Sequence, residues 1–233
     1  MFFGIDPLYL LFALPGLLIA GWASMMTHST FQKYSEVPAS SGATGAEAAS
    51  MLLRSAGIRD VKIEEIDGFL SDHYDPTAKT LRLSTSVYEG HSLSSIGVAC
   101  HEAGHAIQHA AAYAPMNLRS AMVPVTQLSS TFSYFIIIAG FLLQSQKLVL
   151  VGAILFSAAV LFALVTLPVE WDASARAKKL MVKCGIVTQA EQKQAGEVLN
   201  AAFLTYVAAA VSALLTLLYY LIRSGIFGSR SDE

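Results

Sequence analysis

Four long apolar runs separate the polar parts of the chain. They cover residues 7–26, 122–143, 148–168 and 201–222. A membrane-spanning helix needs about 20 predominantly apolar residues, so each run is long enough to cross a bilayer. The first run has only Asp6 as a charge before it, and without a basic n-region it does not resemble a cleaved signal peptide. The pattern therefore predicts four transmembrane helices.

The longest polar stretch, residues 27–121, predicts a small α+β domain. Thr44 and Glu47 have the spacing of a capping box at the start of a helix, which we expect to end near Gly57. Three short segments with strand-like composition follow, at residues 61–66, 69–74 and 80–84.

These runs divide the chain into six predicted parts. In order they are a first span (residues 1–26), an α+β domain (27–121), a hairpin of two spans (122–168), a helix outside the membrane (169–200), a fourth span (201–223) and a tail (224–233). We expect residues 228–233 of this tail to be disordered. The predicted fold class is thus a mainly α membrane protein with a small α+β domain.

Composition agrees with a membrane protein. Of the 233 residues, 54% are hydrophobic and 14% are charged, whereas soluble domains carry about 25% charged residues. The formal net charge of -2 argues against a nucleic-acid partner. The two cysteines form no C-x-x-C pair, which argues against a zinc ribbon, and we expect Cys100 to be a small buried thiol.

The segment His101-Glu102-Ala103-Gly104-His105 carries the main chemical signal. Two histidines four residues apart lie on one face of a helix and can bind one zinc ion. Glu102 is then placed to take a proton from the water that the ion activates. We expect Gly104 to leave room for metal and substrate. The alternative is an ordinary helix with two structural histidines and a surface glutamate.

A catalytic zinc needs a third protein ligand. His109 lies eight residues from His101, about 12 Å along a helix, which is too far to share one ion with it. The metzincin pattern would need glycine and histidine where this chain has Gln108 and Ala111.

Glu170 is the better candidate for the third ligand. It belongs to a cluster of acids that directly follows the third apolar run. Two spans separate it from His101, so both lie on the same side of the membrane. The alternative is that the acids are there because they favour a helix N-terminus.

Two further residues are candidates for catalysis. His73 could donate a hydrogen bond to the oxyanion of a tetrahedral intermediate, or it could be a structural histidine in a turn. Arg176 could also donate a hydrogen bond to the oxyanion, or it could bind a substrate carboxylate. Alternatively, Arg176 forms a basic anchor at the membrane surface together with Lys178 and Lys179.

The chain resembles the neutral zinc metallopeptidases of bacterial membranes, the YugP-like family. More distantly it is similar to gluzincin membrane proteases of the HtpX and CAAX-protease type. The segments that carry the resemblance are the N-terminal span, Ser71-Asp72-His73-Tyr74-Asp75-Pro76, Leu81-Arg82-Leu83-Ser84, the motif from His101 to Gln108, and Pro168-Val169-Glu170-Trp171-Asp172-Ala173.

The resemblance implies a zincin-like domain at the membrane surface. The Glu-x-x-Ala-Asp pattern of the gluzincin proteases places the metal-binding glutamate at Glu170. The aspartate of that pattern is Ser174 here, which changes the expected support of the histidines. The resemblance also implies that residues 80–84 form an edge strand that pairs with an extended peptide. A site-2-type intramembrane protease fits less well, because the only Asp-Gly pair, Asp67-Gly68, lies in a polar stretch.

Together these patterns predict a zinc metallopeptidase of the bacterial inner membrane. Between residues 169 and 200 there are five basic residues, whereas the loop after the second run has only Lys147. The positive-inside rule therefore places the active site in the cytoplasm. We expect a peptide or membrane-protein substrate and contact with the lipid bilayer. A zinc-dependent membrane scaffold or chaperone without turnover is the alternative function, and the oligomeric state stays open.

Overall fold

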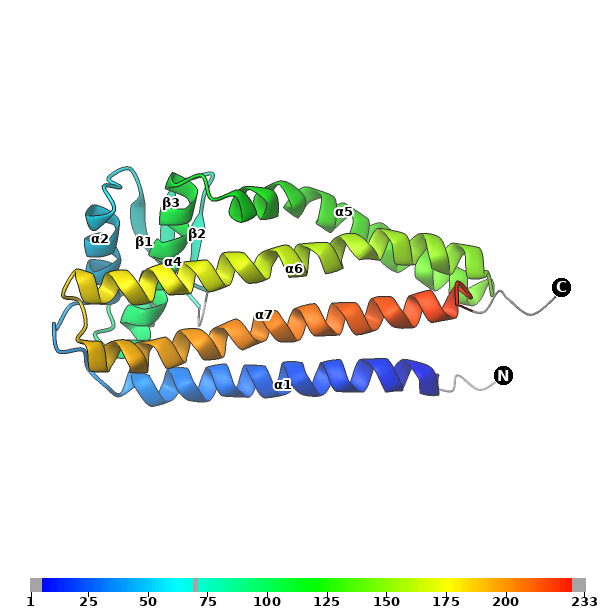
Figure 1. Cartoon of the computed structure of the whole chain (residues 1–233), viewed down its shortest axis with the longest axis horizontal. Helices are drawn as coiled ribbons and strands as arrows, with labels where there is room; N and C mark the ends of the chain where they lie inside the picture. The colour runs from blue at the N-terminus through cyan, green and yellow to red at the C-terminus, as the bar shows by residue number, and fades with distance from the viewer. Residues whose placement is uncertain (1–5, 69–70, 228–233) are drawn as a thin grey trace. The chain divides into compact units, whose positions relative to one another are not determined.

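A computed structural model describes residues 6–68 and 71–227 of the chain, which are mostly helical. The chain divides into two compact units. We call residues 1–22, 118–167 and 206–233 the spanning unit, and residues 23–117 and 168–205 the polar unit. The helices are α1 (Pro7–Ser35), α2 (Gly45–Ser55), α3 (Thr85–Tyr88), α4 (Leu93–Ala110), α5 (Ala114–Leu142), α6 (Gln146–Lys183) and α7 (Gln189–Arg223) (Figure 1).

Within residues 6–68 and 71–227, four helices (α1, α5, α6 and α7) are long and apolar enough to cross a membrane. The number of predicted spans is confirmed at this level. Helix boundaries differ from the expected ones, because α6 continues through Pro168 to Lys183 as one helix. The third span and the helix predicted after it are thus continuous. Residues 228–233 of the predicted disordered tail lie outside the described residues.

Small and hydroxylated residues join the helices of the spanning unit. The Ser133 hydroxyl donates to the carbonyl of Gly152 at 2.9 Å, and the Ser212 hydroxyl donates to the carbonyl of Gly16 at 3.2 Å. Such contacts are typical where helices associate within lipid, since small residues allow the backbones to approach closely. Large apolar side chains such as Phe132 are exposed, as expected for a surface that faces acyl chains.

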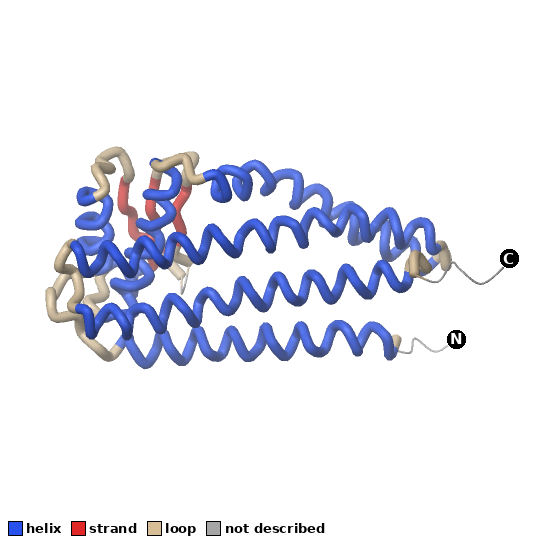
Figure 2. The backbone as a smooth tube through the Cα atoms, viewed as in Figure 1, coloured by secondary structure: helices blue, strands red, loops and turns tan. Residues whose placement is uncertain are grey.

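The polar unit contains a three-stranded sheet formed by β1 (Lys62–Ile66), β2 (His73–Asp75) and β3 (Thr80–Ser84). The strand order is β1-β3-β2, with β3 parallel to β1 and antiparallel to β2. The strands are the red segments of Figure 2. The prediction that residues 80–84 form an edge strand is therefore wrong. Strand β3 pairs with β1 on one side and with β2 on the other, so β1 and β2 are the edges. Residues 69 and 70 of the second predicted strand lie outside the described residues.

Local signals in the sequence place α2 and the start of β1. The Thr44 hydroxyl accepts from the Glu47 amide at 3.1 Å, and the Glu47 carboxylate accepts from the Thr44 amide at 2.9 Å. This reciprocal pair is the predicted capping box. Gly57 ends the helix with a φ of +77°, a conformation that glycine adopts without strain.

One face of the sheet packs on helices and the other carries polar side chains. Leu81 and Leu83 of β3 are fully buried in a core shared with α2 and α4. Between them, Arg82 points to the other face, as the alternation of a strand requires. The sheet thus supports α4, the helix that carries both histidines of the motif.

Candidate metal centre

Helix α4 presents His101 and His105 one turn apart. Ser92 caps the helix by accepting from the Ser95 amide at 3.2 Å. The two imidazole rings are 4.8 Å apart between centroids, as the spacing of four residues predicts. His105 is buried with 7% of its surface exposed. The predicted motif helix is thus confirmed, with its two imidazoles on the same face.

Gly104 allows α6 to approach α4. A Cβ atom at this position would lie 2.6 Å from the carbonyl oxygen of Ala173, closer than real Cβ contacts come. The sequence suggested that this glycine makes room for metal and substrate. In the structure it makes room for the backbone of α6, and this close approach brings Glu170 to the two histidines.

The structure brings Glu170 to both imidazoles. One carboxylate oxygen, Oε2, lies 3.2 Å from Nε2 of His101 and 3.5 Å from Nε2 of His105. With Zn–N and Zn–O bonds of about 2.0–2.2 Å, tetrahedral ligands are about 3.3 Å apart. The donor atoms of the three residues all lie within 4.8 Å of one another, and Glu170 is only 1% exposed. These residues fit a zinc ion.

The other ring nitrogens are held by hydrogen bonds. Nδ1 of His101 lies 3.0 Å from the Ser174 hydroxyl, and Nδ1 of His105 lies 3.0 Å from the side-chain oxygen of Gln108. A proton on Nδ1 leaves the lone pair of Nε2 free for a metal, and such partners fix the orientation of metal-binding histidines. Both rings therefore present the nitrogen that faces Glu170.

Gln108 connects His105 to α6. Its side-chain nitrogen donates to the carbonyl of Val169 at 2.7 Å and to the carboxylate of Asp172 at 2.8 Å. Asp172 in turn accepts from Nε of Arg176 at 2.5 Å. Arg176 is thus linked to His105 through two residues and does not contact it directly.

The sequence patterns indicated no role for Gln108 or Asp172 in supporting the histidines, whereas Ser174 was expected at the position where the gluzincin pattern has a supporting aspartate. One signal was available for each. Gln108 is a polar residue on the buried face of the motif helix, three residues after His105, and it is fully buried. Ser174 lies four residues after Glu170 and therefore on the same face of the helix, and Asp172 lies four residues before Arg176, the spacing of an ion pair on one helix.

Glu102 lies beside the cluster in a half-buried position. Loss of hydration raises the pKa of its carboxyl group, which brings a carboxylate closer to the range where it works as a base near neutral pH. The charges of His101, His105 and Glu170 also act on it. By contrast, burial raises the pKa of the neighbouring Cys100 thiol to about 12, so this thiol stays protonated and is a poor ligand.

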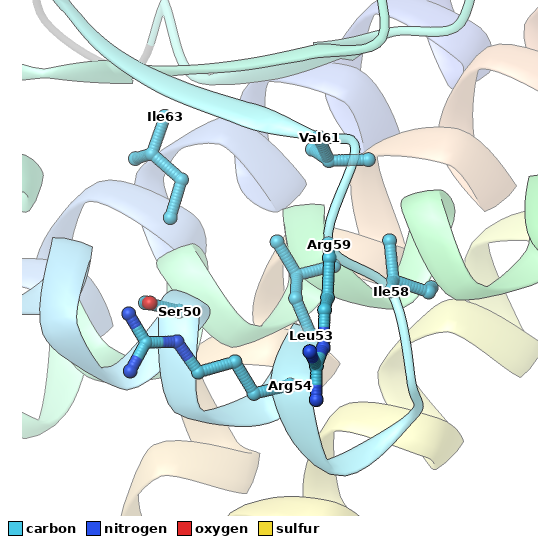
Figure 3. Close-up of a pocket in the computed structure, with 7 residues that line it drawn as sticks. All are labelled: Ser50, Leu53, Arg54, Ile58, Arg59, Val61 and Ile63. Atoms are coloured by element: carbon cyan, nitrogen blue, oxygen red, sulfur yellow. The ribbon is translucent and has the colours of Figure 1, made fainter.

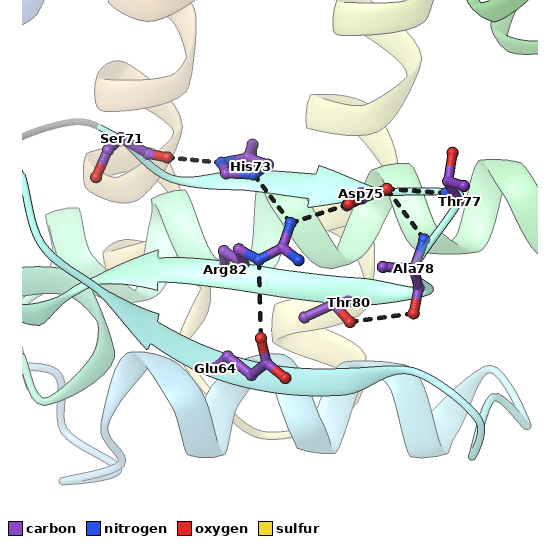
Figure 4. A network of polar contacts seen from close by, with 8 residues as sticks. All are labelled: Glu64, Ser71, His73, Asp75, Thr77, Ala78, Thr80 and Arg82. Atoms are coloured by element: carbon purple, nitrogen blue, oxygen red, sulfur yellow. Dashed lines mark hydrogen bonds and ion pairs between the residues drawn. The ribbon is translucent and has the colours of Figure 1, made fainter.

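His73 is not brought to the three donor residues. It is exposed on β2, where its Nδ1 lies 2.8 Å from the carbonyl of Ser71. Its ring points to the same face of the sheet as Arg82, which also contacts Asp75 and Glu64 (Figure 4). Tyr74, the next residue, points the other way and bonds to His109 of α4. A catalytic role for His73 therefore stays a prediction.

Comparison with known proteins identifies the family. The family described as "Putative neutral zinc metallopeptidase" matches residues 9–225. The chain belongs to this zinc metallopeptidase family. It is also 45% identical over 226 residues to the "Putative membrane protease YugP" of Bacillus subtilis (strain 168), covering 97% of this chain and 99% of the relative. No solved structure matches the chain.

Membership in the zinc metallopeptidase family agrees with the donor set. Among residues 6–68 and 71–227, His101, His105 and Glu170 form the group of histidine and carboxylate side chains that could hold a metal ion. Imidazole nitrogen and carboxylate oxygen are ligands that zinc accepts at catalytic sites. The resemblance seen in the sequence is thus confirmed, and the chain also has the four apolar helices expected of a membrane protein.

Proposed function

We propose that the protein is a membrane-bound zinc endopeptidase of the gluzincin type. In this proposal His101, His105 and Glu170 hold Zn²⁺ and Glu102 is the general base. The observation that supports it most directly is the meeting of three donor atoms within 4.8 Å, although Glu170 is 65 or more residues from either histidine in the sequence. The family description and the name of the relative favour a peptidase over a non-catalytic scaffold.

Bound zinc would lower the pKa of a water molecule and polarise the peptide carbonyl group. The protein's own residues supply the rest. Glu102 takes a proton from water and later passes it to the leaving amine. Ser174 and Gln108 keep the two imidazoles in the orientation that the site requires. Arg176 acts as a positioning residue, through Asp172 and Gln108.

The proposal extends to substrate and location. The substrate is a peptide or a membrane protein, in line with the description of the relative as a membrane protease. The excess of basic residues between positions 169 and 200 favours a site on the cytoplasmic side of the bacterial inner membrane. The net charge of -2 argues against a nucleic-acid partner.

Replacing Glu102 with glutamine tests the mechanism. We expect Glu102→Gln to retain zinc and to lose hydrolysis of unfolded casein by more than about 100-fold, since a catalytic base typically contributes 10²- to 10⁴-fold. Zinc content and casein cleavage are measured on the purified full-length protein. Glu65→Gln, an exposed residue of β1, is the control.

Two outcomes would contradict the proposal. If Glu102→Gln cleaves casein at the rate of the unchanged protein, Glu102 is not the base. If the unchanged protein holds zinc and binds casein without cleaving it, the scaffold function is correct instead. A parallel assay with a chelator distinguishes zinc-dependent cleavage of casein from cleavage by contaminating serine proteases, because serine proteases keep their activity when zinc is removed.

A further inference from the structure

A cavity of about 520 Å³ lies in the polar unit between α2 and β1 (Figure 3). All its lining residues come from residues 50–63, which form the end of α2, the Gly57 turn and the start of β1. Sites for small ligands commonly have volumes of about 300–1,000 Å³. The lining residues are Ser50, Leu53, Arg54, Ile58, Arg59, Val61 and Ile63.

The cavity has an apolar floor. Leu53 and Ile58 are buried, with 3% and 8% of their surfaces exposed. Val61 and Ile63 are half-buried on the strand side and face α2 across the cavity (Figure 3). Ile63 pairs in register with Leu81 of the core, so the cavity is an opening of the hydrophobic core between helix and strand. An apolar side chain inserted here would be removed from water.

Two arginines without carboxylate partners flank this floor. The other arginines of the polar unit form ion pairs, Arg82 with Asp75 and Arg176 with Asp172. Arg54 and Arg59 are exposed and have no ion pair within the described part of the chain. The acid next to Arg59, Asp60, is bound to Lys79 at 2.6 Å. Two guanidinium groups are thus available to a carboxylate, for which their geometry is suited.

Beside the cavity lies an edge of β1. Among the strands of residues 6–68 and 71–227, the order β1-β3-β2 gives β1 a partner on one side only. The Lys62 amide donates to the carbonyl of Lys79 at 3.0 Å, so the backbone groups of Lys62 and Glu64 face the rest of the sheet. Those of Ile63 and Glu65 face away from it, because successive residues of a strand alternate. An extended segment can add to such an edge through main-chain hydrogen bonds.

We propose that this cavity binds the C-terminal end of an extended peptide whose last side chain is apolar. The last side chain enters between α2 and β1, the terminal carboxylate binds Arg54 and Arg59, and the preceding residues pair with the edge of β1. A fatty acid could contact the apolar floor and the two arginines, but it could not form main-chain hydrogen bonds with the edge of β1. This inference does not depend on the proposed peptidase activity.

Binding of a fluorescein-labelled peptide that ends in Val-Leu tests the site. The full-length protein is used in phosphatidylcholine nanodiscs with excess EDTA, so that no metal is present and the result is independent of hydrolysis. We expect the free acid to bind at least about tenfold more tightly than the same peptide with a C-terminal amide, since the amide loses the charge-assisted hydrogen bonds to the two guanidinium groups. Replacing the last leucine with serine should weaken binding by a similar factor.

Variants locate the binding. Arg54→Gln and Arg59→Gln should each weaken binding of the free acid about tenfold and reduce the difference between acid and amide. Lys62→Gln is the matched control, because Lys62 is an exposed cation of β1 that does not line the cavity. It should change affinity by less than about twofold, as expected for a screened surface charge.

The proposal is overturned if acid and amide bind equally, or if the arginine variants bind as Lys62→Gln does. It is also overturned if laurate saturates the cavity while the peptide does not bind, since the ligand would then be a fatty acid. Both arginine side chains are exposed, so we expect these variants to fold, and circular dichroism checks this.

Discussion

The two histidines of the candidate metal centre share one carboxylate but are supported in different ways. Nδ1 of His101 bonds to the hydroxyl of Ser174 on α6. Nδ1 of His105 bonds to the side chain of Gln108 on its own helix, and Gln108 is in turn bonded to α6. His101 is therefore held to α6 by one direct contact, whereas His105 is held to it by a chain of contacts through Gln108.

The difference determines how firmly each ring is oriented. Both N–H groups of the Gln108 amide have an acceptor, the Val169 carbonyl and the Asp172 carboxylate. Its oxygen must therefore face His105, which has to carry its proton on Nδ1. A serine hydroxyl can donate or accept by rotation, so Ser174 leaves His101 free to exchange tautomers. We infer that His105 is the more rigid ligand and His101 the more adaptable one.

Glu170→Gln should have the largest effect on zinc affinity, because it removes the carboxylate that both histidines share. Glu170 is buried against both imidazoles, and an amide oxygen is a much weaker zinc ligand than a carboxylate. We expect zinc affinity to fall by more than about 100-fold, beyond the usual effect of losing a supporting residue. Competition with a chromophoric chelator measures it, with Glu65→Gln as control. Unchanged affinity would mean that the metal, if any, binds elsewhere.

Gly104→Ala should have the second largest effect on zinc affinity, because it separates α4 from α6. The contacts of both histidines with Ser174 and Gln108 depend on how closely these two helices pack. The added methyl group would lie 2.6 Å from the Ala173 carbonyl oxygen, so α6 must move away and take Glu170 and Ser174 with it. We expect zinc affinity to fall by about 100-fold, at the upper end of the range for supporting groups, and the Tm to fall by several degrees.

Gly21→Ala is the matched control for this substitution. Gly21 is also in a helix, but a Cβ atom there would have no neighbour within 4 Å. Alanine is favoured over glycine in helices by about 1 kcal/mol, so the control should not lower the Tm. If both variants behave alike, the contact between α4 and α6 does not control the site.

Much of this centre could be predicted from the sequence. The candidate ligands His101, His105 and Glu170 follow from helical spacing and from the number of spans between them, and the structure brings their side chains together. The supporting role of Gln108 could not be predicted, because a polar residue on a helix has no visible partner until α6 is placed. The resemblance implied an edge position for residues 80–84, but β3 is the central strand, and strand order depends on long-range pairing that local patterns do not encode.

Gln108→Leu tests the more rigid support. The substitution removes the acceptor of the His105 proton and the amide that donates to the Val169 carbonyl and to Asp172, although Asp172 keeps its contact with Arg176. We expect zinc affinity to fall by about 10- to 50-fold, within the range for residues that orient metal ligands. Ser174→Ala is the comparison. It should lower zinc affinity by less than about fivefold, since Nδ1 of His101 can bond to water instead. A larger loss in Ser174→Ala than in Gln108→Leu would reverse our assignment of the rigid ligand.

Ser174→Asp should have the smallest effect and the opposite sign. An aspartate here would accept the Nδ1 proton of His101 and make that imidazole a better donor to zinc, as carboxylate partners do. It would also place a second carboxylate near Glu170 at a site that is only 4% exposed, where an unpaired charge is costly. We therefore expect zinc affinity to rise by about three- to fivefold while the Tm of the metal-free protein falls. A fall in both quantities would mean that the smaller serine is needed for the packing of α6 on α4, and that its hydrogen bond to His101 is secondary.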